Sequence, residues 1–569
     1  MLKKDVENPQ LTVTPAEQVP AGQGSLSIVL IALCTLAFIM CFLVSMSVLR
    51  QFSGTSTYVP IGSHFTDIGI KLLRSLGLRK LVDVNLAFIV ITGFEFAIYG
   101  LGALIIQRQI SARENYRTFL FIWPGAVMAG ALLVVTQALI SGDMFVYADY
   151  GRTIVAHGAN PYFVAPAVFA HDPITRLDDW RDVTAAYGPL WLGFSSLIAL
   201  IAGTSATDYL LLFRISAFAA HLVNIVLVTA ILRTQGRSSR TVTLGAFLYA
   251  WNPLLILESC LSGHNDVFMI TLILLGVLFC ARAEQHAFAR PLHYLPPVIA
   301  FTLAGLIKFT ALPLAALYLI LLARKTLYGT SSAAFKSNKL VSWQWKPAFL
   351  KVLYTGITSG LVIVLLYGPF FIGHSIPDII NSFLNPPSSH LLQHSIMKAF
   401  VEGVGYHGMP AQNSWLYAVL TILTTFKVWS TINMLVVLSG LVVGAMWLWR
   451  TPTTRTLVLS SIAILGPLLI VTTWFFPWYV TWLVALAAVS LPISRQRIAR
   501  ALFAFALVFS ASARLTYLSI GQVDPIDWHA IGCAATMIPP ILAFLICLFI
   551  SRKSWKPTLP DSDAAITTV

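Results

Sequence analysis

Acidic, basic and aromatic side chains gather in a few short motifs of an otherwise apolar chain. The first motif begins Ser141-Gly142-Asp143, continues MFVYADYGR, and is followed by Asn160-Pro161-Tyr162. Asp143 directly follows an apolar stretch, so its carboxylate lies where a membrane helix would meet water. Partial desolvation makes such a carboxylate a better proton acceptor. Asp143 is therefore a candidate general base, and the plainer interpretation is an aspartate that caps a helix.

The other motifs supply hydroxyls, amides, cations and aromatic rings, which are the groups that bind a sugar or a phosphate. A charge at membrane depth is costly and usually has a functional partner. The motifs comprise Tyr187-Gly188-Pro189-Leu190-Trp191, Arg214, Glu258 followed by Ser262-Gly263-His264-Asn265-Asp266, Lys308, and Phe476-Pro477-Trp478-Tyr479. The candidate substrate-binding residues are Asp149, Arg152, Tyr187, Arg214, His264, Asn265, Asp266, Lys308, Trp478 and Tyr479.

Each of these features also has a structural explanation. Arg214 could extend to the lipid headgroups, and His264-Asn265-Asp266 could be a polar turn. Trp478 and Tyr479 could anchor the chain at the membrane interface. The combination of two acids, two bases and a His-Asn-Asp turn on one predicted face favours a site over a solvated surface.

The sequence contains no Walker A, dinucleotide-binding or zinc-binding spacing, and no cofactor is expected. His264 and Asp266 could hold a divalent metal ion, but hydrogen bonding to a sugar or a phosphate is the favoured interpretation. The six cysteines lie in or beside apolar runs without CxxC spacing, so no disulfide framework or metal site is predicted from them.

The elements that must position these residues are membrane helices. Of the 569 residues, 57 % are hydrophobic and 11 % are charged, against about 25 % charged residues in a soluble domain. Apolar runs long enough to cross a bilayer recur along the chain, and lipid-facing segments of that length must be helical. The net charge of +14 would suggest nucleic acid in a soluble protein, but here the basic residues flank apolar helices, and no nucleic-acid partner is expected. We predict an all-α polytopic membrane protein.

About 14 spans are predicted. They cover residues 26–49, 85–107, 118–141, 209–232, 241–260, 266–284, 292–307, 309–324, 349–373, 430–449, 456–474, 476–493, 499–519 and 530–551. Basic loops at 108–117, 233–240, 282–290, 324–346, 450–455, 495–500 and 552–556 are predicted to be cytoplasmic. An even number of crossings between these loops leaves 187–203 and 415–428 as interfacial helices.

This topology places two polar regions, 142–208 and 374–429, on the extracytoplasmic side. One stretch disagrees with it, because the basic amphipathic segment 65–83 also falls outside, which counts against the direction of the first span. The predicted division of the chain is a cytoplasmic polar tail (1–25), accessory helices (26–117), a module bearing the motifs (118–325), a cytoplasmic basic loop (326–348), C-terminal helices (349–551) and a cytoplasmic tail (552–569).

The motifs in order resemble the GT-C glycosyltransferase superfamily. They are the acid at 143, Tyr150-Gly151-Arg152, the asparagine-proline-tyrosine at 160–162, YGPLW at 187–191, NPLL at 252–255, GHND at 263–266, IKFTALPL at 307–314 and FPWY at 476–479. Within the superfamily the chain is most similar to bacterial polyprenol-phosphomannose-dependent α-mannosyltransferases. The resemblance covers residues 118–325 and, more weakly, 474–480.

The resemblance implies a GT-C-like bundle in the plasma membrane that transfers a sugar on the extracytoplasmic face. The donor would be a polyprenyl-phosphate sugar, with mannose expected, and the acceptor a cell-envelope glycan or glycolipid. Asp143 takes the position of the catalytic base, and Arg214 and Lys308 those of the lipid-phosphate ligands. A lipid monophosphate leaves without a general acid, unlike the leaving groups in glycosidases. Direct displacement would give an α-linked product from a β-linked donor.

Two other functions stay open at this point. A secondary transporter or lipid-linked sugar flippase would use intramembrane acids such as Glu95 as proton relays, although no repeated halves are evident in the sequence. A ligase or polymerase that uses lipid-diphosphate oligosaccharides would keep the architecture and change the donor.

Overall fold

The computed structural model describes residues 21–52, 81–109, 111–328, 345–384, 391–493, 496–520 and 528–550, with positions 71, 74, 75 and 77. Most of the amphipathic segment 65–83, the centre of the basic loop 326–348, residues 1–20 of the predicted N-terminal tail and the whole predicted C-terminal tail lie outside the described residues, while residues 21–25 belong to the first helix. Apart from one isolated bridge between Gln393 and Trp474, the described part of the chain is built from helices and connecting segments.

Eleven helices in the described ranges are long and apolar enough to cross a membrane. The prediction of an all-α polytopic membrane protein is therefore confirmed. These helices are α1 (Ala21–Phe52), α3 (Leu81–Arg108), α4 (Ala112–Val134), α7 (Ala206–Thr234), α10 (Asp266–Gln285), α12 (Leu312–Tyr328), α13 (Trp345–Phe371), α17 (Phe426–Arg450), α18 (Thr454–Val471), α20 (Arg497–Ala513) and α22 (Trp528–Phe549).

Shorter helices complete the bundle. They are α5 (Asp143–Val155), α6 (Pro189–Ala202), α8 (Ser239–Ala250), α9 (Pro253–Ile256), α11 (Pro291–Gly305), α14 (Ile376–Leu384), α15 (Ile396–His407), α16 (Trp415–Leu423), α19 (Thr481–Val489) and α21 (Tyr517–Ile520). Single turns are η2 (Pro166–Phe169), η3 (Thr175–Leu177), η4 (Leu257–Leu261), η5 (Phe309–Ala311), η8 (Pro477–Val480) and η9 (Arg514–Thr516).

Four predicted spans differ from the observed helices. The span 118–141 ends early, because α4 stops at Val134 and the chain continues without regular structure to Gly142. The span 241–260 is two helices bent by 49°, because Pro253 lacks an N–H group and its ring excludes the helical carbonyl four residues earlier. The segments 292–307 and 476–493 form only α11, of 15 residues, and the η8–α19 pair. With the bent pair counted as one span, the described residues contain up to twelve helices long enough to cross the membrane, against about 14 spans predicted for the whole chain.

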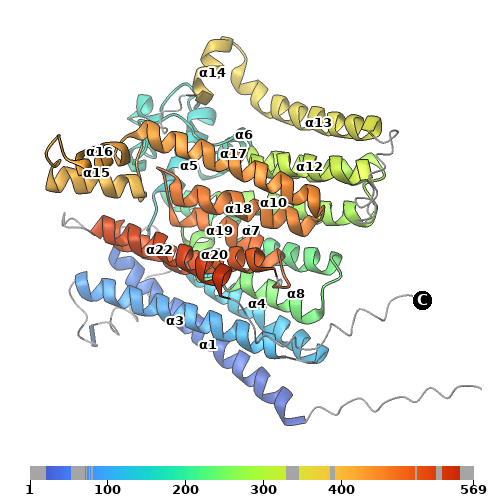
Figure 1. The fold of residues 1–569 in the computed structure, drawn as a ribbon. Helices are drawn as coiled ribbons and strands as arrows, with labels where there is room; N and C mark the ends of the chain where they lie inside the picture. The colour runs from blue at the N-terminus through green and yellow to red at the C-terminus, as the bar shows by residue number, and fades with distance from the viewer. Residues whose placement is uncertain are drawn as a thin grey trace, which may run out of the picture.

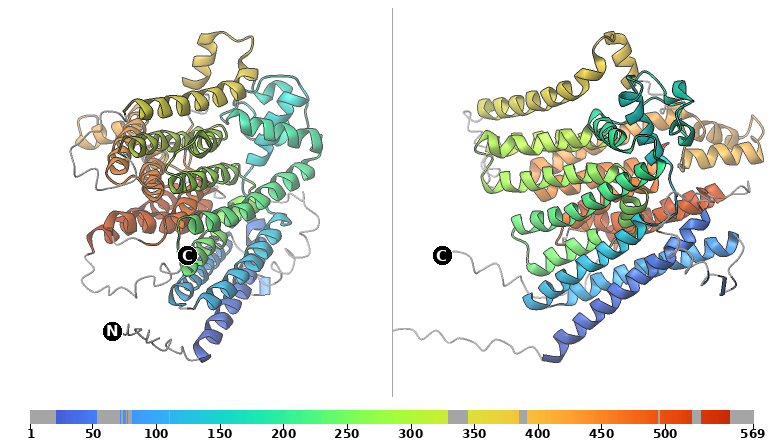
Figure 2. Two further views of the ribbon diagram at one scale, coloured as in Figure 1. Left: turned by 90° about the vertical axis from the view of Figure 1, so that its right-hand side faces the viewer. Right: turned by 180° about the vertical axis from the view of Figure 1, so that it is seen from behind.

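The long helices run side by side, and the short polar-region helices gather at one end of the bundle. In Figure 1 α15 and α16 lie at the left, α5 lies left of centre, and α14 stands at the top next to the left end of α13. The view from behind in Figure 2 shows α15 and α16 at the corresponding end, now on the right. The segments predicted to be interfacial, 187–203 and 415–428, form the separate helices α6 and α16. The ends of α7 and α10 and the start of α18 meet at the opposite end, where Thr234, Glu284 and Thr454 line one pocket. Three loops predicted to be cytoplasmic therefore share an end of the bundle.

Glu95, the intramembrane acid that a transporter could use, is fully buried in an ion pair. Its carboxylate accepts hydrogen bonds from Arg514 of η9 and, at 2.7 Å, from the Ser45 hydroxyl of α1. Removing one partner of a buried ion pair leaves an uncompensated charge and is strongly destabilising, so the two groups must stay together. This ion pair ties the N-terminal helices α1 and α3 to the C-terminal helices.

Gly188 fixes the start of α6 against the end of α11. Its N–H donates to the Ile307 carbonyl at 3.0 Å, and a Cβ atom at this position would lie 2.1 Å from the Leu306 carbonyl oxygen. Because that contact is with backbone, a side chain at Gly188 can only be accommodated by moving α6.

We therefore expect Gly188→Ala to lower the thermal unfolding midpoint, with a loss of about 1–3 kcal/mol of stability. Gly193 on the same helix is the matched control, because its added Cβ would meet nothing within 4 Å. Thermal unfolding of both variants checks this packing, and equal midpoints would contradict it.

Candidate functional site

Asp143 begins α5 at the end of the bundle where the polar regions gather. Its side chain is 14 % exposed. Its backbone N–H donates a hydrogen bond to the Ser141 hydroxyl oxygen at 3.3 Å. One turn later Tyr147 donates a hydrogen bond to Asp143 Oδ2 at 3.3 Å. The described contacts of the carboxylate use Oδ2, which leaves Oδ1 for a ligand.

The turn from Ser262 to Asp266 reaches Asp143 because the preceding helix is broken. After Pro253 the chain forms the π-helical turn η4, which carries Glu258. Single π-helical turns often occur at functional sites. Gly263 then adopts φ +60° beside the Met144 side chain, a conformation that glycine adopts without steric cost. The reversal brings His264 back toward α5.

His264 lies between two carboxylates and is almost fully buried. Its Nδ1 is 3.5 Å from Asp143 Oδ2, and its Nε2 is 3.4 Å from Glu258 Oε2. Its ring stacks on Trp478 with centroids 3.8 Å apart. The histidine therefore has a fixed orientation next to the candidate base.

Asp266 and Lys308 form an ion pair within the same cluster. The Lys308 ammonium donates to both Asp266 oxygens, at 2.9 and 3.0 Å, and the Trp482 indole N–H donates to Asp266 Oδ1 at 2.6 Å. The ammonium also lies 4.4 Å from the Tyr479 ring centroid. Lys308 is thus a held cation with a third N–H group that these two hydrogen bonds do not use.

An aromatic cavity of about 50 Å³ adjoins Asp143. Aromatic faces of this kind stack on the apolar faces of sugar rings. The cavity is lined by Asp143, Val146, Tyr150, Trp180, Val183, Ala186, Tyr187, Leu391, Trp474, Phe476, Trp478 and Tyr479.

The structure thus brings together seven of the sequence-predicted site residues: Asp143, Tyr187, His264, Asp266, Lys308, Trp478 and Tyr479. Asn265 lies in the same turn, fully buried, and its side-chain amide has no hydrogen-bond partner among the described residues. The sequence interpretation left out Tyr147 and Trp482, and it did not assign Glu258 to the site. Tyr147 lies one helical turn after Asp143, a spacing that could have indicated it.

Arg214 is buried beside the turn that carries His264, and its hydrogen bonds go to backbone carbonyls. Its guanidinium donates to the carbonyls of Leu261, Val134, Thr136 and Ala138 at 2.7, 3.4, 2.7 and 2.6 Å. It therefore joins the segment after α4 to the turn that carries His264. The four bonds fix the guanidinium on backbone carbonyls, and its contact with a phosphate stays a prediction.

Asp149 and Arg152 hold the loop after α5 and do not line the cavity. Arg152 pairs with Asp172 at 2.6 Å and donates to the Gly203 carbonyl. The Thr175 hydroxyl donates to Asp149 Oδ1 at 2.7 Å, and the Trp180 N–H donates to Asp178 Oδ1 at 2.7 Å. These contacts fix the loop that carries the cavity residue Trp180.

Asp149 and Asp178 form a buried acidic pair beneath this loop. Burial, together with the neighbouring carboxylate, raises the pKa of Asp178 to about 8, and burial raises the pKa of Asp149 to about 6. Their pKa values in the unfolded chain are near 3.9. The folded protein therefore binds protons here more tightly than the unfolded chain, and the stabilisation is complete below about pH 4 and is lost as the pH rises through about 8.

We expect the thermal unfolding midpoint to fall between pH 6 and pH 9, and Asp178→Asn to reduce this fall. An asparagine amide can donate to Asp149 without a titrating proton, so the pair no longer acquires a second charge. Asp182→Asn, an exposed acid in the same loop, is the control and should keep the wild-type pH dependence. A pH dependence that is the same in all three proteins would contradict the shared proton.

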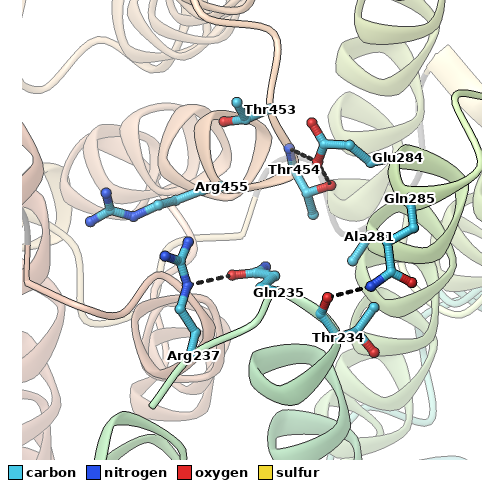
Figure 3. Close-up of a pocket in the computed structure, with 9 residues that line it drawn as sticks. All are labelled: Thr234, Gln235, Arg237, Ala281, Glu284, Gln285, Thr453, Thr454 and Arg455. Atoms are coloured by element: carbon cyan, nitrogen blue, oxygen red, sulfur yellow. Dashed lines mark hydrogen bonds between the residues drawn. The ribbon is translucent and has the colours of Figure 1, made fainter. Parts of the chain in front are cut away.

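A larger pocket, of about 460 Å³, lies at the other end of the bundle. Figure 3 shows Arg237 directed toward Gln235, and Thr454 directed toward Glu284. Arg455 donates to the carbonyls of Ser490 and Pro492. This pocket contains none of the sequence-predicted site residues. Among the described residues, no group of three or more His, Cys, Asp or Glu side chains could hold a metal ion.

Comparison with known proteins points to a single class of enzyme. Residues 54–324 match the model of the MptA_B family, described as Alpha-(1->6)-mannopyranosyltransferase, N-terminal domain. The match ends where the predicted motif-bearing module ends, near residue 325, and begins well before residue 118. The resemblance to α-mannosyltransferases is therefore confirmed for this part of the chain.

Three curated relatives carry related names. The chain is 25 % identical over 235 residues to a probable alpha-(1->6)-mannopyranosyltransferase of Mycolicibacterium smegmatis, covering 39 % of this chain and 40 % of the relative. It is 22 % identical over 363 residues to alpha-(1->6)-mannopyranosyltransferase A of Corynebacterium glutamicum, covering 62 % and 68 %. It is 29 % identical over 166 residues to an alpha-(1->6)-mannopyranosyltransferase of Mycobacterium tuberculosis, covering 27 % and 26 %. The matches thus span between about a quarter and two thirds of the relatives. No solved structure gives a significant match.

Proposed function

We propose that this chain is an inverting membrane glycosyltransferase. It moves a sugar, which we take to be mannose, from a polyprenyl-phosphate donor to a hydroxyl group of a cell-envelope glycan or glycolipid. The observation that carries the proposal is the partly exposed carboxylate of Asp143, held beside an aromatic cavity and near the Lys308–Asp266 ion pair. The similarity to alpha-(1->6)-mannopyranosyltransferases supports mannose as the sugar.

In the proposed reaction Asp143 removes the proton from the acceptor hydroxyl. Tyr147 and His264 hold Oδ2, so Oδ1 accepts the proton. The acceptor oxygen bonds to the anomeric carbon as the bond from that carbon to the phosphate oxygen breaks, and the electron pair leaves with the prenyl phosphate. General-base catalysis of this kind contributes about 10²–10⁴-fold.

Lys308 stabilises the negative charge on the departing phosphate. Asp266 fixes the ammonium group in advance, and Trp482 in turn holds Asp266 by a hydrogen bond. A preorganised cation in a partly dry site is more effective than one in water. Because the prenyl phosphate leaves as a stable anion, the reaction requires no general acid. A sugar ring is larger than the 50 Å³ cavity, so donor binding must displace part of the aromatic wall.

The proposal places this site on the extracytoplasmic face of the plasma membrane. The end of the bundle away from the site carries basic loops at 233–240, 282–290 and 450–455, which the positive-inside rule assigns to the cytoplasm. The catalytic module of the proposal comprises residues 118–325, with helices 26–117 as accessory elements. Side chains from the C-terminal helices, Trp478 and Trp482, complete its site.

The proposal is tested by assaying purified, lipid-reconstituted protein against a panel of donors: polyprenyl-phosphate mannose, polyprenyl-phosphate glucose, a polyprenyl-diphosphate sugar and GDP-mannose. We expect glycosidic product and free polyprenyl phosphate from the first donor. Release of polyprenyl diphosphate would instead indicate a ligase. Movement of labelled lipid across the bilayer without a new glycosidic bond would indicate a flippase and overturn the proposal.

A further inference from the structure

Four side chains form a chain of polar contacts from the candidate base into the interior of the protein. It runs from Asp143 to His264, from His264 to Glu258, and from Glu258 to Tyr517, whose hydroxyl donates to Glu258 Oε1. Tyr517 belongs to α21, more than 250 positions after Glu258. The fold thus assembles the chain from three distant parts of the sequence.

The side chains of His264 and Glu258 face one another in the interior of the protein. Both side chains are almost fully buried, at 1 % and 2 % exposure. His264 Nε2 and Glu258 Oε2 are 3.4 Å apart, within ion-pair distance, and neither atom has a hydrogen-bond partner in the part of the chain that the structure describes. The backbone N–H of His264 also donates a hydrogen bond to the backbone carbonyl of Glu258 at 3.2 Å. Burying a carboxylate next to an imidazole is costly unless a proton passes between them or is shared.

We propose that His264 and Glu258 are positioning residues that receive, through Asp143, the proton taken from the acceptor hydroxyl. This inference rests on the proposed function of the site. The Nε2 edge of the His264 ring faces the Glu258 carboxylate and its Nδ1 faces Asp143 Oδ2, so Nδ1 is the atom that accepts the proton in this proposal. In many enzymes the base that activates a nucleophile is itself oriented by a third group. Here Glu258 is the group that orients His264.

Each proton and electron pair in the proposed step has a defined donor and acceptor. The acceptor O–H bond breaks and the proton binds Asp143, while the electron pair of the donor's C–O bond leaves on the prenyl phosphate. The Asp143 carboxyl group then turns so that its protonated oxygen faces His264, and the proton passes to Nδ1, which leaves an imidazolium between the two carboxylates. Asp143 returns to its ionised form, and the imidazolium releases the proton to water when product leaves.

Other charged and titratable groups face this cluster from every side. Tyr147 contacts His264 Nδ1 at 3.4 Å, and the Asp266–Lys308 pair follows two residues later in the same turn. On the membrane-interior side, Arg514 acts on Glu258 electrostatically while it is paired with Glu95. Since Arg514 and Lys308 each have a carboxylate partner, Asp143 and Glu258 are the negative charges that hold a proton on His264.

The test is the pH–rate profile of Glu258→Gln with polyprenyl-phosphate mannose. We expect kcat to fall about 10-fold or more, with KM nearly unchanged, and the acid limb of kcat/KM to move to lower pH by about one unit or more. The limb moves because the cluster loses one of the two negative charges that favour the imidazolium. Apparent values from such a profile belong to the coupled cluster. Glu258→Asp keeps the charge and should restore the limb toward its wild-type position.

Glu284→Gln is the matched control, a partly buried glutamate in an ion pair with Lys325 at the other end of the bundle, and its profile should equal that of the wild type. If Glu258→Gln does not fold, His264→Gln gives the same readout, because it removes the imidazolium itself. A uniform loss of kcat with the acid limb in place would overturn the inference while leaving the glycosyltransferase intact. Absence of transfer by the wild-type protein would instead overturn the proposed function.

Discussion

Asp143→Asn should abolish sugar transfer almost completely, with kcat lowered by about 10²–10⁴-fold. Asparagine has nearly the same shape and can still accept the hydrogen bond from Tyr147, but it cannot take up a proton at the pH of the assay. Donor binding should be largely preserved, because the proposed phosphate ligand Lys308 is unchanged. The measurement is the rate of product formation from polyprenyl-phosphate mannose, with donor affinity measured separately.

Asp182→Asn is the control for this experiment, since Asp182 is an exposed acid of the neighbouring loop and should keep wild-type turnover. Thermal unfolding of both variants separates a loss of chemistry from a loss of folding. Near-normal turnover by Asp143→Asn would rule out Asp143 as the base.

Lys308→Met should lower kcat/KM by about 10²–10³-fold. The structure holds the ammonium in place through Asp266 and the ring of Tyr479, a residue that lines the cavity. Methionine keeps the length of the side chain and removes the charge, so the departing phosphate loses its electrostatic stabilisation. Steady-state kinetics with polyprenyl-phosphate mannose measures the effect.

The single substitution leaves the Asp266 carboxylate buried without its partner, which can destabilise the fold. The double variant Lys308→Met with Asp266→Asn removes both charges and should still be deficient in transfer. The matched pair at the other end of the bundle is Lys325 with Glu284, also 2.9 Å apart, and its corresponding double variant should keep activity. Full activity of the Lys308 double variant would exclude Lys308 as the phosphate ligand.

The membrane architecture could be predicted from composition because hydrocarbon leaves the backbone few alternatives to a helix. The parity of the basic loops predicted that 187–203 and 415–428 are separate from the spans, and the structure forms the short helices α6 and α16 there. Hydropathy alone did not predict where a span is broken. The chain around Pro253 is apolar throughout, and the bend depends on Pro253 together with the Asn252 side chain, which accepts from the Leu255 N–H and donates to Ser510 of α20.

The site was partly predictable, for a related reason. Asp143 and His264-Asn265-Asp266 interrupt apolar runs, and such interruptions are visible in a sequence. Trp482 and Tyr517 lie within apolar segments, where an aromatic residue is ordinary, and only the fold shows that they bind Asp266 and Glu258.

Arg214 has contacts that the sequence did not reveal. A cation in a membrane helix suggested a phosphate ligand, but four backbone carbonyls surround its guanidinium. Carbonyls left unpaired where a helix ends are acceptors that a sequence does not reveal.

The most direct test of single displacement by an activated hydroxyl is the anomeric configuration of the product. Reconstituted protein is incubated with β-linked polyprenyl-phosphate mannose and an acceptor, and the new linkage is assigned by NMR. One displacement assisted by Asp143 predicts an α-linked product, with one polyprenyl phosphate released per bond formed. A β-linked product would require a second, covalent step and would contradict Asp143 as a simple base.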